Sequence, residues 1–170
     1  GTLVTRVRER RSNLGLTVSA TTRAPRKGEV DGVNYFFLTR EEFDRRVANG
    51  EFVEWAEVHG NCYGTLVSEV TSKLASGSSL ILEIDVQGAL QVKERFPEAV
   101  LIFIKPPSLE VLRERLVGRG TETPETIELR MANAADELAL ADRYDDVVVN
   151  DDLDRATDEL VRVLDMHERI

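Results

Sequence analysis

LILEIDVQG, residues 80–88, contains the signal that decides the fold class. Its first five residues are a compact apolar run, and residues 100–104 and 147–149 form two more runs of this kind. Such runs are typical of strands that are buried on both faces of a parallel sheet. The segments between and after the runs have helical spacing: residues 86–96, 109–118 and 125–141. This alternation predicts an α/β fold in which helices wrap a parallel sheet on both faces.

The first half of the chain departs from this alternation. Residues 14–19 predict a short strand, and Thr39 followed by Glu42 is a capping box for a helix that ends at Gly50. Residues 51–64 have the pattern of a hairpin with a turn near residues 59–61. We therefore expect the segment from about residue 35 to residue 64 to form an inserted small sheet. Further helices are expected at residues 3–10, 65–76 and after Asp151.

Length, charge and cysteine content exclude several classes of protein. A chain of 170 residues is expected to form one domain, and its net charge of −9 argues against a general nucleic-acid surface. No apolar run approaches the length of a membrane span, so no membrane partner is expected. Cys62 is the single cysteine, which rules out an internal disulfide and favours a cytoplasmic location. With only His59 and His167 beside it, a Cys/His zinc site is excluded.

A basic loop follows the first strand, in the segment VSATTRAPRKGEVDGVNY of residues 18–35. Arg23 and Arg26 lie three residues apart among hydroxyl side chains, and Gly28 closes the loop. Arginine presents paired donors that match the oxygens of a dianionic phosphate. The alternative is a solvated basic loop without a ligand.

Two carboxylates stand at the end of the run of residues 80–84, Glu83 within it and Asp85 directly after it. Ligands of open parallel sheets bind beyond the carboxyl ends of the strands. Asp85 stands at such an end, and Glu83 points to the same side two residues earlier. Asp85 is therefore a candidate for holding Mg²⁺ through water. The alternative is that Asp85 only caps the next helix.

A third motif is the loop Gly118-Arg119-Gly120, which Arg130 follows on the next predicted helix. Glycine on both sides of Arg119 favours a loop that can move. Mobile arginines suit a lid that closes over phosphates and neutralises charge in the transition state. The alternative is an ordinary exposed loop.

Taken together, these motifs resemble the guanylate kinase family, whose members transfer a phosphoryl group from ATP to GMP. The similarity runs in order along nearly the whole chain, through residues 18–26, 28–32, 35–37, 51–56, 63–65, 83–88, 106–108, 118–123 and 149–151. It implies a single domain with a P-loop-NTPase-type parallel-sheet core, at about residues 1–19, 66–118 and 143–170. It further implies an inserted mixed-sheet GMP-binding region at about residues 20–65 and a helical lid at about residues 119–142.

The resemblance also implies roles for individual residues. Arg23, Arg26, Tyr35 and Tyr63 would hold the GMP phosphate, and Ser19, Glu54 and Thr65 would read the guanine, with Glu83 and Asp85 beside the same substrate. Glu54 would accept from N1–H and the exocyclic amine, a donor pair that adenine lacks. Arg26, Arg119 and Arg130 would act on the transferring phosphoryl group. The ATP side would consist of Thr2, Arg119, Asn150 and Asp151, and Mg²⁺ would bind near Thr2 and Asp85.

One departure from the family pattern lies at the start of the sequence. Gly1-Thr2-Leu3-Val4 resembles the tail of a phosphate-binding P-loop, and the lysine of that loop is not in the sequence. We expect the native chain to carry the missing part of the P-loop. The predicted partners are therefore the two substrates, GMP and ATP. The alternative is an inactive guanylate-kinase-like binding module that uses the GMP pocket for a phosphorylated or protein ligand. The lid arginines, Glu54 and Asp85 favour the enzyme.

Overall fold

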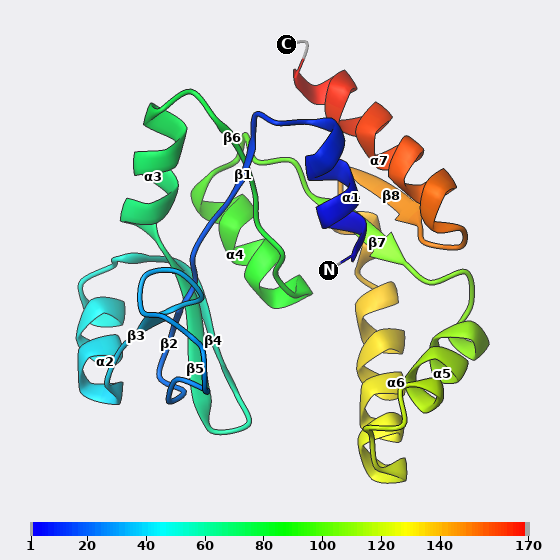
Figure 1. The fold of residues 1–170 in the computed structure, drawn as a ribbon, viewed down its shortest axis with the longest axis horizontal. Helices are drawn as coiled ribbons and strands as arrows, with labels where there is room; N and C mark the ends of the chain where they lie inside the picture. The colour runs from blue at the N-terminus through cyan, green and yellow to red at the C-terminus, as the bar shows by residue number, and fades with distance from the viewer. Residues whose placement is uncertain (1, 169–170) are drawn as a thin grey trace. The chain divides into compact units, whose positions relative to one another are not determined.

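The computed structural model describes residues 2–168 and divides the chain into two compact units (Figure 1). The central unit comprises residues 10–99, and the terminal unit comprises the described residues up to 9 and from 100 onward. Within residues 2–168, no helix is long and apolar enough to cross a membrane.

The central unit contains two sheets and three helices. Strands β1 (Leu14–Leu16) and β6 (Ser79–Ile81) form a parallel pair. The second sheet has the order β3-β2-β5-β4; β2 is parallel to β3, whereas β5 is antiparallel to both β2 and β4. Its strands are β2 (Ala20–Thr21), β3 (Phe36–Phe37), β4 (Phe52–Val58) and β5 (Asn61–Leu66). The helices are α2 (Arg40–Ala48), α3 (Val67–Ala75) and α4 (Val86–Arg95). The expected inserted mixed sheet is thus confirmed.

Local sequence signals explain the ends of α2 and the β4–β5 hairpin. The Thr39 hydroxyl accepts a hydrogen bond of 3.1 Å from the backbone N–H of Glu42, so Thr39 caps α2 as predicted. Glu42 does not complete the capping box, because its carboxylate pairs with Arg46 at 3.0 Å. His59 and Gly60 have φ angles of 51° and 83°, as a two-residue turn between twisted strands requires.

Hydrophobic clusters on β4 anchor the hairpin. Phe52 stacks on Phe43 of α2 with ring centroids 4.4 Å apart, in a cluster that also contains Ala20, Cys62 and Leu66. The next residue, Val53, packs with Val70 of α3 and Val92 of α4. Because consecutive residues of β4 are buried in different clusters, apolar packing fixes the strand and the polar residue that follows, Glu54.

The terminal unit contains the second parallel pair, β7 (Ile102–Lys105) and β8 (Asp146–Val149). Its helices are α1 (Thr2–Arg10), α5 (Leu109–Gly118), α6 (Pro124–Leu138), a 3₁₀ turn (Ala141–Arg143) and α7 (Leu153–Glu168). Thr123 caps α6 and Pro124 is its first residue, as predicted. An ion pair between Arg113 and Glu128 joins α5 to α6.

Two predicted strands are longer than the observed ones. The run of residues 80–84 pairs only up to Ile81, and the run of residues 14–19 only up to Leu16, because the β1–β6 ladder has three residue pairs. Residues 82–85 are therefore a loop that leads into α4. The α/β class with parallel strands is confirmed, and the described residues form these strands as two separate pairs.

Candidate active site

A buried carboxylate lies at the centre of the hairpin. Glu54 on β4 is 7% exposed, and the fully buried Thr65 on β5 donates a hydrogen bond of 2.7 Å from its hydroxyl to Oε1 of Glu54. The ladder is irregular between Phe52 and Glu54: Phe52 pairs with Leu66, and Glu54 pairs with Thr65. This bulge carries Glu54 away from the face of Phe52 and onto the face of Thr65. The sequence folds locally so that one acidic side chain is buried beside one donor.

The environment of Glu54 favours its neutral form. Burial raises the pKa of Glu54, and the charge of Asp85 raises it further, whereas the Thr65 hydrogen bond acts in the opposite direction. Asp85 itself is exposed and caps α4, since its Oδ1 accepts a hydrogen bond of 2.8 Å from the N–H of Gly88. The capping role considered for Asp85 is therefore present, and its metal role stays a prediction.

The basic loop is organised by Glu29. Nη1 and Nη2 of Arg23 donate to the two carboxylate oxygens of Glu29, each at 3.0 Å, and the two side chains are 13% and 19% exposed. The Arg23 guanidinium also lies 5.2 Å from the centroid of the Tyr35 ring. The pair raises the pKa of Arg23 and lowers the pKa of Glu29. Both groups are charged at neutral pH, and the Arg23 side chain has a defined orientation.

Glu29 also shapes the turn that carries Arg26. Its Oε1 accepts a hydrogen bond of 2.6 Å from the backbone N–H of Arg26, and its own N–H donates to the carbonyl of Arg26 at 3.0 Å. Gly28 has a φ of 86° within this turn, a conformation that favours glycine. The Arg26 side chain is exposed, and among residues 2–168 its guanidinium has no hydrogen-bond partner. Arg26 thus extends from a fixed backbone as an available cation.

The two tyrosines connect the basic loop to the hairpin. The rings of Tyr35 and Tyr63 meet edge to face with centroids 6.4 Å apart. Tyr63 and Thr65 are two residues apart on β5, so they point to the same face of the sheet. Ser19 lies at the start of the loop, where its carbonyl accepts a hydrogen bond of 2.9 Å from Phe36. Glu83 is exposed in the loop before α4.

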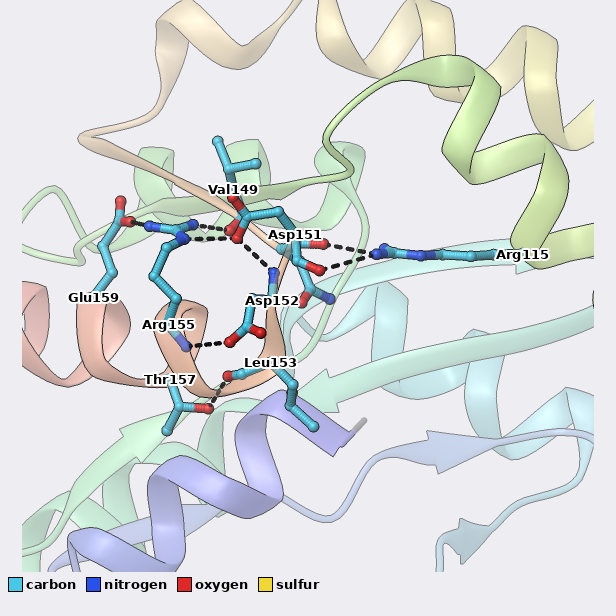
Figure 2. Close-up of polar contacts among 9 residues, drawn as sticks. Arg115, Val149, Asp151, Asp152, Leu153, Arg155, Thr157 and Glu159 are labelled. Carbon is cyan, nitrogen blue, oxygen red and sulfur yellow. Dashed lines mark hydrogen bonds and ion pairs between the residues drawn. The ribbon is translucent and has the colours of Figure 1, made fainter.

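In the terminal unit, the loop after β8 contains Asn150 and Asp151. Figure 2 shows Asp151 in this loop. The N–H of Asn150 donates to the carbonyl of Lys105, the last residue of β7, at 2.8 Å. Nη2 of Arg115, on α5, lies 3.0 Å from the carbonyl of Asn150 and 3.5 Å from that of Asp151. Arg115 therefore contacts this loop from α5.

Arg155 of α7 supports the same loop (Figure 2). Its Nε donates to Oδ1 of Asp151 at 2.6 Å, and its guanidinium also contacts Glu159 and the carbonyl of Val149. The N–H of Asp152 and the guanidinium of Arg155 lower the pKa of Asp151. The side-chain oxygen of Asp151 is thereby held inside the loop.

The remaining predicted residues of the terminal unit are exposed. Arg119 is the C-cap of α5, and Thr2 is the first residue of α1. Arg130, on α6, forms an ion pair with Glu122 at 3.3 Å. The predicted site residues thus fall into two groups: the residues predicted to bind GMP lie in the central unit, and the residues predicted for the ATP side lie in the terminal unit.

Several residues that shape these groups were missed from the sequence. Glu29 had a readable signal, an acidic residue six positions after Arg23 in the same loop. Arg155 also had a readable signal, because it stands four residues after Asp151. Arg115 had none, because it contacts loop atoms that are distant along the chain. The same is true of Glu69 on α3, which accepts a hydrogen bond of 2.9 Å from the N–H of Val18 and so holds the segment before Ser19.

Comparison with known proteins gives a consistent result. The family model described as guanylate kinase matches residues 3–167. A guanylate kinase of Halalkalibacterium halodurans is 52% identical over 164 residues, which cover 96% of this chain and 80% of the relative. A guanylate kinase of Gloeobacter violaceus is 56% identical over 163 residues, with the same coverage of 96% and 80%. The crystal structure of guanylate kinase from Anaplasma phagocytophilum matches with a TM-score of 0.76 and 39% identity, over 97% of this chain and 80% of that one.

Proposed function

The chain belongs to the guanylate kinase family, and we propose how its residues divide the work of that family's reaction. The activity is the transfer of the γ-phosphoryl group of ATP to GMP, on a core of the P-loop NTPase type. The observation that carries this function is the extent of the similarity: two guanylate kinases are 52% and 56% identical in sequence over 96% of the chain. Nothing in these comparisons favours the inactive binding module.

Guanine recognition is assigned to Glu54, Thr65 and Ser19. The Thr65 hydroxyl holds Oε1 of Glu54, and the carboxylate retains further lone pairs for the N1–H and exocyclic amine of guanine. Adenine has no such pair of donors, so it would leave a buried carboxylate unpaired. The burial of Glu54 supports this assignment, because discrimination by an unpaired group is strongest where water is excluded.

The GMP phosphate is assigned to Arg23, Arg26, Tyr35 and Tyr63. Arg23 is held in place by Glu29 and the Tyr35 ring, which supports a binding role. Arg26 is exposed and its guanidinium makes no hydrogen bond to residues 2–168, which supports a role toward the transferring phosphoryl group as well. Both arginines carry the paired donors that phosphate oxygens accept.

Arg119 and Arg130 are assigned to the transferring phosphoryl group, and Asn150 and Asp151 to the adenine side of ATP. The exposure of both arginines, together with the two glycines that flank Arg119, supports a lid that covers residues 119–142. Phosphoryl transfer relies on positioned positive charge and requires no covalent intermediate. Residues 20–65 form the GMP-binding region in this proposal.

Mg²⁺ is part of the proposal, with Asp85 and Thr2 as protein contacts. Within residues 2–168, no three carboxylate, histidine or cysteine side chains lie close enough to hold a metal ion alone. This fits Mg²⁺, which keeps several waters and binds mainly through substrate phosphates with one or two protein ligands. Asp85 offers an exposed carboxylate with one oxygen used in capping. When bound, the ion neutralises phosphate charge.

The decisive experiment is a coupled assay of the full-length protein with ATP, Mg²⁺ and GMP, together with Glu54→Gln. We expect turnover with GMP in the parent, and a GMP-over-AMP preference in kcat/KM that falls at least roughly tenfold in the variant. Glu57→Gln, an exposed carboxylate on the same strand, is the matched control and leaves the preference unchanged. Absence of turnover with intact GMP binding would reject the enzyme, and an unchanged preference in Glu54→Gln would reject the assignment of Glu54.

A further inference from the structure

Gly88, in the first turn of α4, lies against the carboxylate of Glu54. A Cβ atom placed at Gly88 would lie 2.8 Å from Oε2 of Glu54 and 3.3 Å from its Cδ. Side-chain carbons essentially never approach other heavy atoms to less than 3.0 Å. The same Cβ would lie 3.3 Å from Oδ1 of Asp85, the capping oxygen of the helix. Glu54 therefore occupies space that any other residue at position 88 would fill.

The backbone of Gly88 gives no other reason for a glycine. Gly88 is not among the residues with positive φ, and it lies inside α4. In a helix interior glycine is less favourable than alanine by roughly 1 kcal/mol. Glycine at this position thus lowers the stability of the helix but permits the close approach of Glu54.

The two ends of the Glu54 carboxylate are confined by different elements. Oε1 accepts the hydrogen bond of 2.7 Å from Thr65 on β5, and Oε2 lies against Gly88 on α4. The backbone of Gly88 is fixed in turn, because its N–H donates to Asp85. When a Cβ is added, the group that must move is the Glu54 carboxylate.

We propose that Gly88 is a specificity-determining residue that positions Glu54 for guanine by leaving room for Oε2. The proposal rests on the proposed role of Glu54 as the guanine acceptor. It predicts that Gly88 contributes to the preference for purine nucleotides that carry an N1–H and an amine over those that lack this donor pair. The nucleotide phosphate does not depend on it, because Arg23 and its partners lie on other elements.

The test is Gly88→Ala, assayed with GMP and AMP in the full-length enzyme. A carboxylate displaced from its hydrogen-bonding position loses much of its discrimination, so the GMP-over-AMP ratio of kcat/KM falls roughly tenfold or more. The melting temperature does not fall correspondingly, because alanine favours the helix. Gln87→Ala, at the exposed neighbouring position of the same turn, is the control and keeps the ratio.

A second comparison keeps the test valid if Gly88→Ala folds poorly. In a Glu54→Ala background the obstructing carboxylate is gone, so adding Gly88→Ala leaves kcat/KM for GMP unchanged and raises the melting temperature, because alanine favours the helix. Such dependence on the partner is the sign of direct coupling between two side chains. Equal effects of Gly88→Ala in both backgrounds would overturn the proposal.

The outcomes separate this inference from the function on which it rests. If Glu54→Gln lowers the preference for GMP but Gly88→Ala does not, Gly88 has no role in specificity and Glu54 keeps its own. Equal losses of kcat/KM for GMP and AMP in Gly88→Ala would mean a structural role only, and would also overturn the proposal. If neither variant changes the preference, the assignment of Glu54 fails and the inference fails with it.

Discussion

The hydroxyl of Thr65 donates a hydrogen bond of 2.7 Å to the carboxylate of Glu54, and both side chains are buried on neighbouring strands. Burial raises the pKa of Glu54, and the hydrogen bond from Thr65 opposes this rise. In its proposed role, Glu54 accepts two donors from a nucleobase and has to be ionised to do so. On that proposal, the Thr65 bond would serve recognition as well as folding.

Thr65→Val removes the donor and preserves the shape of the side chain. We expect the free energy of unfolding at neutral pH to fall by about 2 kcal/mol, the usual cost of losing a hydrogen bond to a buried charged group. The loss shrinks on acidification, because a protonated Glu54 depends less on the donor. Denaturant unfolding at a series of pH values measures both effects. A loss that is independent of pH would show that the bond does not act through the charge of Glu54.

Glu54→Gln is expected to stabilise the fold at neutral pH while it removes guanine recognition. Because the pKa of Glu54 is raised in the folded state, its contribution to stability is full at low pH and is lost as the pH rises through the folded pKa. Glutamine has no charge to desolvate and still accepts from Thr65. The variant should therefore be more stable than the parent at neutral pH, and the difference should vanish in acid. Thermal unfolding at both pH values is the measurement, and a less stable variant at neutral pH contradicts it.

Glu29→Ala is expected to weaken GMP binding without a matching effect on turnover. Without Glu29, the Arg23 side chain loses its two hydrogen bonds to the carboxylate, and the Arg26 N–H loses its acceptor. We expect KM for GMP to rise roughly tenfold, which corresponds to about 1.4 kcal/mol, with a small change in kcat. Asp44→Ala removes an exposed partner of Arg40 and is the control, since surface pairs of this kind contribute little. A KM unchanged in Glu29→Ala would remove Glu29 from the phosphate site.

The Arg23–Glu29 pair should also persist into acid. The pKa of Glu29 is lowered by Arg23 and by the N–H of Arg26, so its contribution to stability is present above the ordinary glutamate range and is lost as the pH falls through the folded value. Any acid-dependent loss of GMP binding at moderately low pH should therefore come from Glu54, whose pKa moves in the opposite direction.

Arg119→Ala and Arg130→Ala are expected to lower turnover far more than GMP affinity. Both side chains are exposed, so the fold does not depend on them, and removal of one stabilising group from a phosphoryl-transfer site costs roughly a hundredfold in kcat. Arg113→Ala, which breaks the pair with Glu128 between α5 and α6, is the control for the same region. Steady-state kinetics with both substrates measure the effect. Equal losses in kcat and GMP affinity would mean that these arginines bind the ground state.

Sequence patterns correctly predicted helix caps and helix bounds, because these features depend on residues that are close together in sequence. The caps at Thr39 and Thr123 were correct, and α5 has the predicted bounds of 109–118. The predicted ends of strands were wrong where pairing with another strand sets the end, as at Ile81. An apolar run does not show how many of its residues pair with a neighbouring strand. The bulge before Glu54 and the approach of Gly88 to Glu54 have no local signal, since they depend on contacts between residues far apart in sequence. The resemblance identified Glu54, but only the structure shows what holds it.

Arg155→Met tests the support of the proposed adenine loop. Arg155 contacts the side chain of Asp151 and the carbonyl of Val149, so its loss should loosen the loop that carries Asn150 (Figure 2). We expect KM for ATP to rise roughly fivefold to tenfold, while kcat at saturating ATP and KM for GMP stay the same, because the loop would bind the ground state and the transition state equally.

Arg155→Lys should resemble Arg155→Met rather than the parent, because one ammonium group cannot reproduce the forked donors that reach several acceptors. Arg162→Met, at an exposed position farther along α7, is the matched control and leaves KM for ATP unchanged. Equal increases in KM for ATP in Arg155→Met and Arg162→Met would show that α7 acts on ATP binding only through its overall stability. An increase in KM for GMP alone would show that Asn150 and Asp151 do not lie on the ATP side.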